Sequence, residues 1–314
     1  MPPELEPLAI LAVALLIDSI FGEYPTPLHP VVWLGTAIKA LLRVAPDQGP
    51  IRQFLFGVLI VVLIVLFAIA MVFVADAWTA EHLWIRLAVD LFFLKASFAL
   101  RELGRAAFGV VRPLEAGDLP TARAALRSLC SRDPSELSSE ELIAATVESL
   151  AENTSDSFVA PLFWFVIFGV PGALAYRAIN TLDAMIGYRG RYEYLGKAAA
   201  RVDDVANWIP ARITASLLLL AGFVMRADVR RGWRILRRDA GRTPSPNAGR
   251  PMAAMAGLLG VELSKPNVYR LGDADVPLTP KHVNDAWKLC RIAALLFAIG
   301  LSVAALSIGI PFSG

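Results

Sequence analysis

The run QFLFGVLIVVLIVLFAIAMVFVA occupies residues 53–75 and contains no charged side chain. A second uncharged run extends from Ile292 to Gly314, and both runs are 23 residues long. An α-helix needs about 20 predominantly apolar residues to cross the hydrocarbon core of a bilayer. Soluble cores rarely contain two such runs. The chain is therefore predicted to be an all-α polytopic membrane protein.

The composition supports the same class. Hydrophobic residues make up 56% of the 314 residues and charged residues 18%, whereas a soluble domain is about 25% charged. The net charge of +2 gives no indication of nucleic acid as a partner, because the arginines cluster where membrane topology would place them. Cys130 and Cys290 fit no CxxC pattern, so neither a disulfide framework nor a zinc site is predicted. No Lys or Arg precedes Lys39, so the basic n-region of a cleavable signal peptide is missing and the first apolar segment is expected to stay in the mature protein.

Apolar stretches predict the spanning segments. The fourth stretch is interrupted by FGVPGA, residues 168–173, and helix breakers at membrane depth are typical of a broken or re-entrant segment. The fifth has thirteen uncharged residues between Arg212 and Arg226, which is short for a full crossing. We expect about four full transmembrane helices, plus re-entrant or interfacial helices and cytoplasmic helical segments, in a single integral membrane domain over 1–314. The six stretches are about 7–22, 53–75, 85–100, 157–176, 209–225 and 292–312.

Basic residues indicate the orientation, because cytoplasmic connections are enriched in Lys and Arg. The connection 23–52 contains three basic residues, whereas the connection 76–84 contains none. Residues 226–291 carry thirteen Lys or Arg against six Asp or Glu. Both termini are therefore predicted to lie outside. The polar segments predicted to face the cytoplasm are about 101–156, 177–212 and 226–291.

Charged residues also occur inside the apolar stretches, where insertion scales assign each a cost of about 2.5–3.5 kcal/mol. Asp18 lies in the first stretch, and Asp90 and Lys95 lie in the third. One interpretation is that Asp90 and Lys95 neutralise each other along one helix. The other is a secondary transporter or channel that uses all three as intramembrane sites. No internal repeat is visible, so an inverted-repeat transporter architecture has no direct support in the sequence.

An acidic ladder precedes the fourth stretch, in ESLAENTSDS at residues 148–157. Glu148, Glu152 and Asp156 recur every four residues. Ser138 and Glu141 form a capping-box pattern, which predicts that a helix begins there and carries the three acids on one face. Such a face is either solvated or holds a cation. Polar residues continue from the ladder to the membrane boundary, which favours the second interpretation.

Three further polar clusters follow. In YRAINTLDAMIGYR, residues 176–189, Arg177, Asn180 and Asp183 lie three residues apart on one helical face. In RVDDVANWIPAR, residues 201–212, two adjacent aspartates stand one turn before Asn207. In SPNAGRP, residues 245–251, a turn leads into an apolar helix, whose free N–H groups would suit an anion.

Together the clusters offer acids for a divalent metal ion and arginines for phosphate or carboxylate, which indicates nucleoside triphosphate chemistry. Each cluster alone is also compatible with a purely structural role. The sequence has no GxxxxGK[ST], GxGxxG or HExxH motif that would specify the site.

Longer strings resemble a known family. ESLAENTSDSFVAPLFW (148–164), YRAINTLDAMIGYR, RVDDVANWIPAR and SPNAGRPMAAMAG (245–257), in this order, resemble the adenosylcobinamide-phosphate synthase family of cobalamin biosynthesis. The opening LLIDSIFGEYPTPLHPVVWLG (15–35) is also similar to that family, so the resemblance spans nearly the whole chain. Glu23 stands where the family has aspartate, and residues 263–280 match only loosely.

The resemblance implies an ATP-dependent amide ligation at the cell inner membrane, with ATP and Mg²⁺ as cofactors. A propionate carboxylate of adenosylcobyric acid, a corrinoid, would be joined to the amine of aminopropanol or of its phosphate. A carboxylate is a poor electrophile, so ATP must activate it, and Mg²⁺ and arginines must neutralise charge on the transferred phosphoryl group. The lipid bilayer and other cobalamin-assembly membrane enzymes are further expected partners. A relative that has lost catalysis is a third interpretation, against which the retained acids count.

The chemistry that the implied reaction demands leads us to assign roles to the clusters. Glu148, Glu152, Arg177 and Asp183 are the candidate catalytic residues, and Glu152, Asp156, Asp203 and Asp204 are the candidate metal ligands. His29 is a candidate contact to the corrinoid, although a histidine before Pro30 at a helix start is more often structural. The candidate substrate-binding residues are Asn153, Asn180, Arg189, Asn207, Arg212, Ser245, Asn247 and Gly249.

Overall fold

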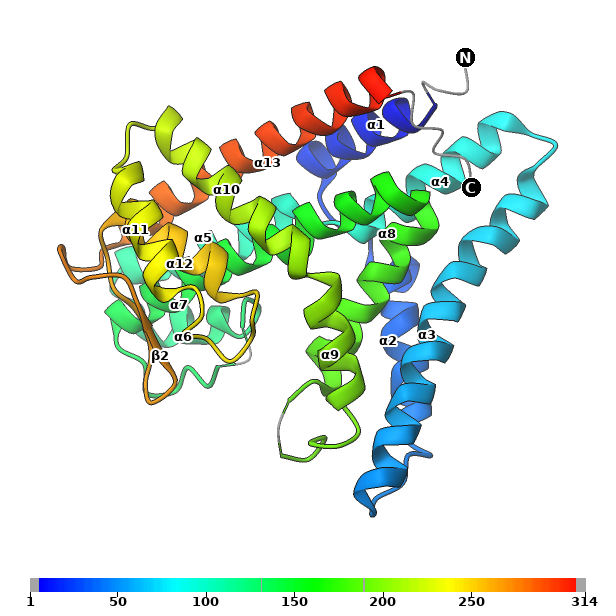
Figure 1. The fold of residues 1–314 in the computed structure, drawn as a ribbon, viewed down its shortest axis with the longest axis horizontal. Helices are drawn as coiled ribbons and strands as arrows, with labels where there is room; N and C mark the ends of the chain where they lie inside the picture. Colours follow the sequence, from blue (N-terminus) through cyan, green and yellow to red (C-terminus); the bar gives the residue numbers. More distant parts are fainter. Residues whose placement is uncertain (1–5, 131, 189, 309–314) are drawn as a thin grey trace. The chain divides into compact units, whose positions relative to one another are not determined.

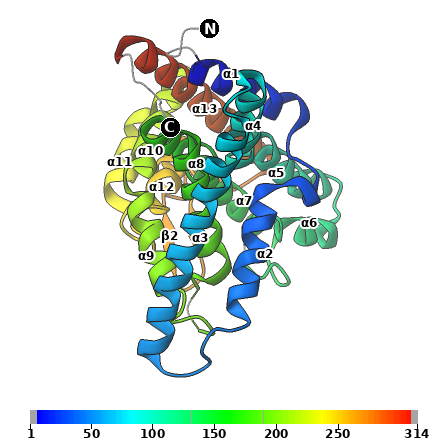
Figure 2. The same cartoon turned by 90° about the vertical axis from the view of Figure 1, so that its right-hand side faces the viewer.

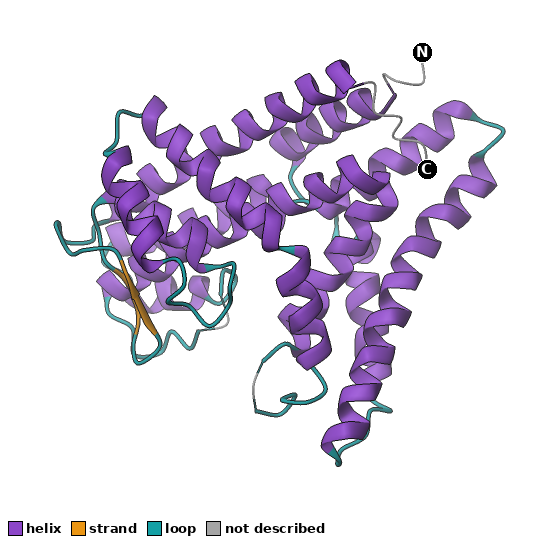
Figure 3. Cartoon of the chain, viewed as in Figure 1, coloured by secondary structure: helices purple, strands orange, loops and turns teal. Residues whose placement is uncertain are grey.

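Helices form most of the structure, a computed structural model that describes residues 6–130, 132–188 and 190–308 (Figure 3). The chain divides into two compact units. Unit 1 comprises residues 1–99, 160–206 and 302–314, and unit 2 comprises residues 100–159 and 207–301. The predicted all-α class is confirmed. That the whole chain acts as one integral membrane domain stays a prediction.

Unit 1 is organised around the long helix α3, which packs against α4, α8 and α9. Helix α1 packs against α4, and α2 runs beside α3 and also contacts α8 (Figures 1 and 2). The elements of unit 1 are α1 (Glu6–Phe21), the 3₁₀ turn η2 (Thr26–Leu28), α2 (Pro30–Leu42), α3 (Pro50–Thr79), α4 (Leu83–Ser97), α8 (Ala160–Ile186) and α9 (Lys197–Ala206).

Unit 2 has its own apolar core, to which α5, α7, α10, α12 and α13 contribute side chains. A short antiparallel hairpin, with Leu263 opposite Leu271, packs against α7 and α12. The elements of unit 2 are α5 (Leu100–Glu115), α6 (Leu119–Leu126), α7 (Ser139–Thr154), the π-helical turn η3 (Ser155–Val159), α10 (Trp208–Val224), α11 (Val229–Asp239), α12 (Gly249–Leu259), β1 (Leu263–Lys265), β2 (Tyr269–Leu271) and α13 (Pro280–Ile308), whose last residues belong to unit 1.

Three helical segments of the described chain are long and apolar enough to cross a membrane: Pro50–Thr79, Ser139–Ile186 and Pro280–Ala304. Helices α9 and α10 add a fourth crossing only if the two together form one broken span. The predicted number of about four crossings agrees with the upper count, but the segments differ from those expected. Helices α1 and α4, in the first and third stretches, are 16 and 15 residues long and are not among the candidate spans of the described chain, whereas the fourth stretch, predicted to be broken or re-entrant, lies within Ser139–Ile186. Exposed side chains on α3 are apolar along most of its length, as expected for a helix that contacts lipid.

The FGVPGA sequence breaks α8, as predicted. Phe168 and Gly169 leave helical geometry, and Gly169 adopts φ 66° and ψ −159°. Glycine reaches this region without the steric cost that a Cβ would add. Pro171 lacks the N–H group that would continue the helical ladder. The interruption is therefore fixed by local sequence.

The predicted capping box also forms. The backbone N–H of Glu141 donates to Ser138 Oγ at 3.3 Å, and Glu141 Oε2 accepts from the backbone N–H of Ser138 at 2.8 Å. Two N–H groups that the first turn of α7 leaves unpaired are thereby satisfied. Helix α7 starts at Ser139 and continues through η3 into α8 as one segment to Ile186.

Asp239 joins the end of α11 to the hairpin. Its carboxylate, which is fully buried, accepts two hydrogen bonds of 2.8 Å from Arg238 and one of 2.8 Å from the backbone N–H of Gly272. Arg242 adds an ion pair of 3.0 Å. Burial opposes ionisation of Asp239, but the Arg238 and Gly272 hydrogen bonds and the two arginine charges outweigh it and lower its pKa.

Asp239→Asn is expected to destabilise the protein by about 1.5–3 kcal/mol, the usual contribution of a hydrogen bond to a charged group. Because the folded-state pKa of Asp239 is lowered, its carboxylate contributes its full stabilisation at any pH above the unfolded-state pKa of about 3.9. This contribution is lost as the pH falls through the folded-state pKa. Thermal unfolding of the native protein and of the variant in detergent, at several values between neutral and acidic pH, measures the difference in stability. The difference between native protein and variant should shrink below about pH 4; a difference that stays constant in acid would contradict the assignment.

Candidate functional site

The acidic ladder follows α7 into the π-helical turn. Glu148 is only 5% exposed, whereas Glu152 and Asp156 are half-buried. Burial rules out a solvated face as the explanation for Glu148. Asp156 lies beyond the end of α7, within η3, so it does not continue the α-helical register of the two glutamates. Asn153 donates its side-chain amide to the carbonyl of Ser149 at 3.0 Å.

Arg132 neutralises Glu148. Its Nη2 donates to Glu148 Oε2 at 2.7 Å, and both side chains are largely buried. The other carboxylate oxygen, Oε1, is buried and has no hydrogen-bond partner among the described residues. Glu148 therefore keeps one oxygen available inside the protein. The sequence pattern missed Arg132, which lies 16 residues earlier in a loop and has no spacing signal that relates it to α7.

The hairpin brings further polar groups to Glu148. The Tyr269 hydroxyl and Lys265 lie close enough to Glu148 to interact with its carboxylate. Burial of Tyr269, and next the charge of Glu148, raise the pKa of the phenol, which keeps it protonated. Neither residue was a sequence candidate, because the hairpin falls in the segment that matches the family only loosely.

A second polar group in unit 2 contains two arginines. The Arg212 guanidinium stacks on the Trp208 ring at 3.8 Å from its centroid, and its Nη1 lies 3.5 Å from Asn247 Oδ1. Arg250 is close enough for the two positive charges to repel. Neither arginine has a carboxylate within 4.0 Å among the described residues, and Arg250 Nε is buried without a partner there. Two adjacent cations without an acidic partner are the arrangement expected of an anion site.

The turn before α12 is ordered by its own side chains. Ser245 Oγ accepts from the backbone N–H groups of Asn247 at 3.2 Å and Ala248 at 3.4 Å. A Cβ at Gly249 would lie 2.4 Å from the Ala240 carbonyl oxygen, so this position requires glycine. The apolar helix predicted after this turn begins at Gly249. Asn207 is buried at the start of α10.

The remaining candidates belong to unit 1. Arg177 Nη1 donates to Asn180 Oδ1 at 3.3 Å, as their spacing on α8 predicts. Arg177 Nε is buried without a partner among the described residues. Asp183 lies within electrostatic reach of Asp204, and Asp203 and Asp204 are half-buried on α9. Arg189 lies outside the described residues.

No group of three or more His, Cys, Asp or Glu is arranged to hold a metal ion within the described parts of the chain. The ladder acids belong to unit 2, and Asp203 and Asp204 belong to unit 1. A metal ion bound here would therefore take one or two carboxylates and complete its coordination with other oxygens, as Mg²⁺ does when it binds phosphates.

Lys95 corrects one sequence interpretation. It is fully buried and pairs with Asp18 at 3.2 Å and with Glu23 at 3.0 Å, rather than with Asp90. The intrahelical Asp90–Lys95 pair is therefore wrong. Residues five apart in an α-helix point about 140° away from each other, because each residue turns the helix by about 100°. Lys95 instead holds α1 and the following loop against α4.

His29 has structural partners. Its Nδ1 accepts from the backbone N–H of Val31 at 3.2 Å at the start of α2, and its Nε2 contacts Glu23, which also binds Lys95. Asp18 of the first stretch and Lys95 of the third thus belong to one internal network with Glu23 and His29. Because Lys95 is paired, it is not the free intramembrane charge that the transporter hypothesis requires.

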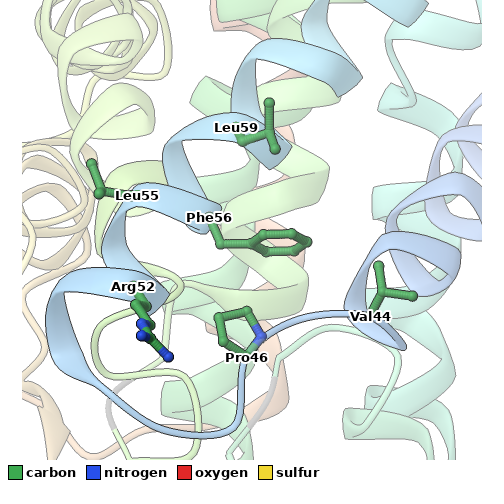
Figure 4. Close-up of a pocket in the computed structure, with 6 residues that line it drawn as sticks. All are labelled: Val44, Pro46, Arg52, Leu55, Phe56 and Leu59. Carbon is green, nitrogen blue, oxygen red and sulfur yellow. The ribbon is translucent and has the colours of Figure 1, made fainter.

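One cavity of about 460 Å³ lies in unit 1, between the α2–α3 loop and the first turns of α3 (Figure 4). Its lining is apolar except for Arg52, and Phe56 and Leu59 come from the predicted membrane-spanning helix. None of the candidate residues lines it. The cavity offers no set of polar groups for the chemistry that the clusters indicate.

The chain is a polytopic helical membrane protein, and its unit 2 carries a buried glutamate and a pair of half-buried arginines. Comparison with known proteins gives the particular family: the CobD/Cbib family model matches residues 11–296. The chain belongs to this family of cobalamin biosynthesis proteins.

Several curated relatives agree along nearly their whole length. The cobalamin biosynthesis protein CobD of Dehalococcoides mccartyi is 44% identical, over 94% of this chain and 99% of the relative. A probable CobD of Methanothermobacter thermautotrophicus is 39% identical, over 93% and 95%. The CobD of Rhodobacter capsulatus is 42% identical, over 83% of each. No solved structure matches the chain significantly.

Proposed function

We propose that this chain catalyses ATP-dependent amide formation between a propionate carboxylate of adenosylcobyric acid and the amine of aminopropanol or its phosphate. The observation that carries the proposal is the pair Arg212 and Arg250, which lie together without an acidic partner in the described chain. Such a pair suits a phosphate group. Membership of a cobalamin biosynthesis family supports a corrinoid as one substrate.

The reaction needs two bond exchanges. A carboxylate oxygen of the corrinoid forms a bond to a phosphorus of ATP, while the bond from that phosphorus to its leaving group, ADP or diphosphate, breaks. The amine nitrogen then bonds to the acyl carbon, the acyl C–O bond breaks, and the phosphorylated leaving group departs. The nitrogen loses a proton to a base. Activation is required because a carboxylate is a poor electrophile.

Arg212 and Arg250 would hold the phosphate oxygens in this scheme. Guanidinium groups bind such oxygens through paired N–H donors and stay charged throughout. Asn247 and the N-terminus of α12 would add neutral donors. These donors are in place before charge develops, which is how preorganised groups stabilise a transition state.

Glu152 and Asp156 would hold Mg²⁺. When bound, this ion would neutralise negative charge on the phosphate oxygens. Their half-buried carboxylates fit an ion that takes only one or two protein ligands. Glu148, with its buried unpartnered Oε1, would accept the proton from the amine. Arg132 and Tyr269 would hold that carboxylate in place. Arg177, Asn180 and Asp183 of unit 1 stay candidate substrate contacts, and Asp203 and Asp204 stay candidates for a second metal site.

We also place the protein in the cell inner membrane, with its phosphate-binding groups on the cytoplasmic side. The basic excess of residues 226–291 supports this orientation. ATP is available on that side.

Glu152→Gln and Asp156→Asn are each expected to lower product formation at limiting Mg²⁺ by about a hundredfold or more, as loss of a group that stabilises transition-state charge does. Part of the loss should be recovered at high Mg²⁺. Glu140→Gln is the matched control, because Glu140 is an exposed acid in the first turn of the same helix. Near-normal turnover of both variants at limiting Mg²⁺ would show that these two acids bind no metal ion.

The function is tested by reconstituting the purified full-length protein in lipid and supplying adenosylcobyric acid, Mg²⁺-ATP and either aminopropanol or its phosphate. Mass spectrometry of the corrinoid should show the amide product only when ATP, Mg²⁺ and one of the amines are all present. The better amine substrate then identifies the physiological one. Product that forms equally well without ATP, or no product with either amine, would overturn the proposal.

A further inference from the structure

Helix α11 has the highest density of positive charge in unit 2. Its sequence VRRGWRILRRD contains five arginines in eleven residues, and it lies beside α10 and α12 (Figure 1). Gly232, Ile235, Leu236 and Asp239 are buried and form its inward face. The arginines divide into two sets with different surroundings.

The first set has structural partners. Arg231 donates to the carbonyl of Gly257 at 2.6 Å and to Asp275 at 3.0 Å. Arg238 binds Asp239 and also Asp273, each at 2.8 Å. These two arginines hold α11 against α12 and the loop that follows the hairpin.

The second set has no such partners. Arg226, just before α11, and Arg230, Arg234 and Arg237 are all exposed. Among the described residues, none of the four has a carboxylate within 4.0 Å or a side-chain hydrogen bond. Arg230, Arg234 and Arg237 follow the spacing i, i+4, i+7 and therefore share one face of the helix. We call these four residues the α11 arginine row.

Apolar and aromatic side chains adjoin this row. Phe223 and Val224, in the last turn of α10, are 75% and 59% exposed. Trp233, which is 52% exposed, lies between Arg230 and Arg237 on α11. Helix α10 belongs to the candidate broken span. Exposed apolar residues at the end of such a helix, followed by tryptophan and arginine, are typical of the boundary between hydrocarbon and headgroups.

We propose that the α11 arginine row, with Trp233, binds the phosphate headgroups of anionic phospholipids. The charge is complementary, and the adjoining apolar residues favour a lipid surface over an acidic protein or a nucleic acid. Anionic leaflets attract juxtamembrane basic residues, and the attraction falls as salt increases. This binding goes beyond the proposed ligation, because none of the four arginines belongs to the groups that would handle substrate.

The test uses full-length protein in nanodiscs that contain phosphatidylcholine and a minority of phosphatidylglycerol. Either lipid is brominated in its acyl chain near the headgroup, and quenching of Trp233 is obtained by subtracting the signal of the Trp233→Phe variant. Brominated phosphatidylglycerol should quench more strongly than its share of the lipid predicts, by an enrichment of about fivefold or more, the effect of one arginine near an anionic surface. The enrichment should decline at high salt.

Variants then assign the effect to the row. Replacing Arg226, Arg230, Arg234 and Arg237 by glutamine should abolish the enrichment, whereas replacing all four by lysine should retain it. The matched control removes the same charge from four other exposed arginines of unit 2, Arg105, Arg112, Arg127 and Arg270, and should behave like the native protein.

Three outcomes would overturn the proposal. The first is equal quenching by the two lipids in the native protein. The second is an equal loss of phosphatidylglycerol enrichment in the row variant and in the control variant. The third is binding of an RNA or an acidic peptide by the row without any lipid enrichment. Because the readout is fluorescence, it is independent of whether the ligation is observed.

Discussion

Replacing Arg212 and Arg250 together by glutamine is expected to lower kcat/KM of the ligation by about a hundredfold to a thousandfold, the usual cost of losing one preorganised donor to a developing negative charge. The physical reason is the absence of acidic partners in the described chain, which leaves both guanidinium groups available for phosphate oxygens. The loss should appear for ATP if the pair holds the nucleotide. It should appear for aminopropanol phosphate, and not for aminopropanol, if the pair holds the phosphorylated amine.

The matched control for this prediction is Arg127→Gln with Arg270→Gln, which removes the same charge from exposed positions. Arg212→Lys should recover little activity, because an ammonium group lacks the planar fork of donors and stacks less well on Trp208. An Arg212/Arg250 variant that retains native kinetics with both amines and with ATP would exclude these residues from phosphate binding.

Lys95→Met is expected to destabilise unit 1 by about 3–5 kcal/mol, because removal of one partner from a buried ion pair leaves an uncompensated charge. Here two carboxylates, Asp18 and Glu23, lose the cation between them. The midpoint of thermal unfolding of the purified protein in detergent measures the effect.

A double-mutant cycle separates the two possible partners of Lys95. Coupling of Lys95→Met with Asp18→Asn should be large, whereas coupling with Asp90→Asn should be small. The fully neutral combination of Lys95→Met, Asp18→Asn and Glu23→Gln should recover much of the lost stability. A strong coupling of Lys95 with Asp90 and none with Asp18 would contradict this assignment and support an ion pair between Asp90 and Lys95 within α4.

Local signals predicted the parts of the fold that depend on neighbouring residues. The capping box needs only Ser138 and Glu141, three residues apart, and it formed as expected. The break in α8 needs only a glycine and a proline close together, and it also formed. The apolar stretches predicted the helices because the bilayer imposes length and hydropathy on each segment separately.

Contacts between distant residues were not predictable in this way. Lys95 meets Asp18 and Glu23 more than 70 residues earlier, and no periodicity relates them. Arg250 stood inside the quoted SPNAGRP string, but its closeness to Arg212 depends on how α10 and α12 pack. The π-helical turn that removes Asp156 from the register of the ladder has no single-residue signal either.

The most direct test of the proposed ligation follows one oxygen atom of the corrinoid carboxylate. Adenosylcobyric acid labelled with ¹⁸O in its free propionate is incubated with the reconstituted protein, Mg²⁺-ATP and the preferred amine. If ATP activates the carboxylate, one labelled oxygen must leave on the phosphorus that was attached to it. It should appear in inorganic phosphate if ADP is released, or in AMP if diphosphate is released. Amide product accompanied by unlabelled phosphate and unlabelled AMP would contradict the account.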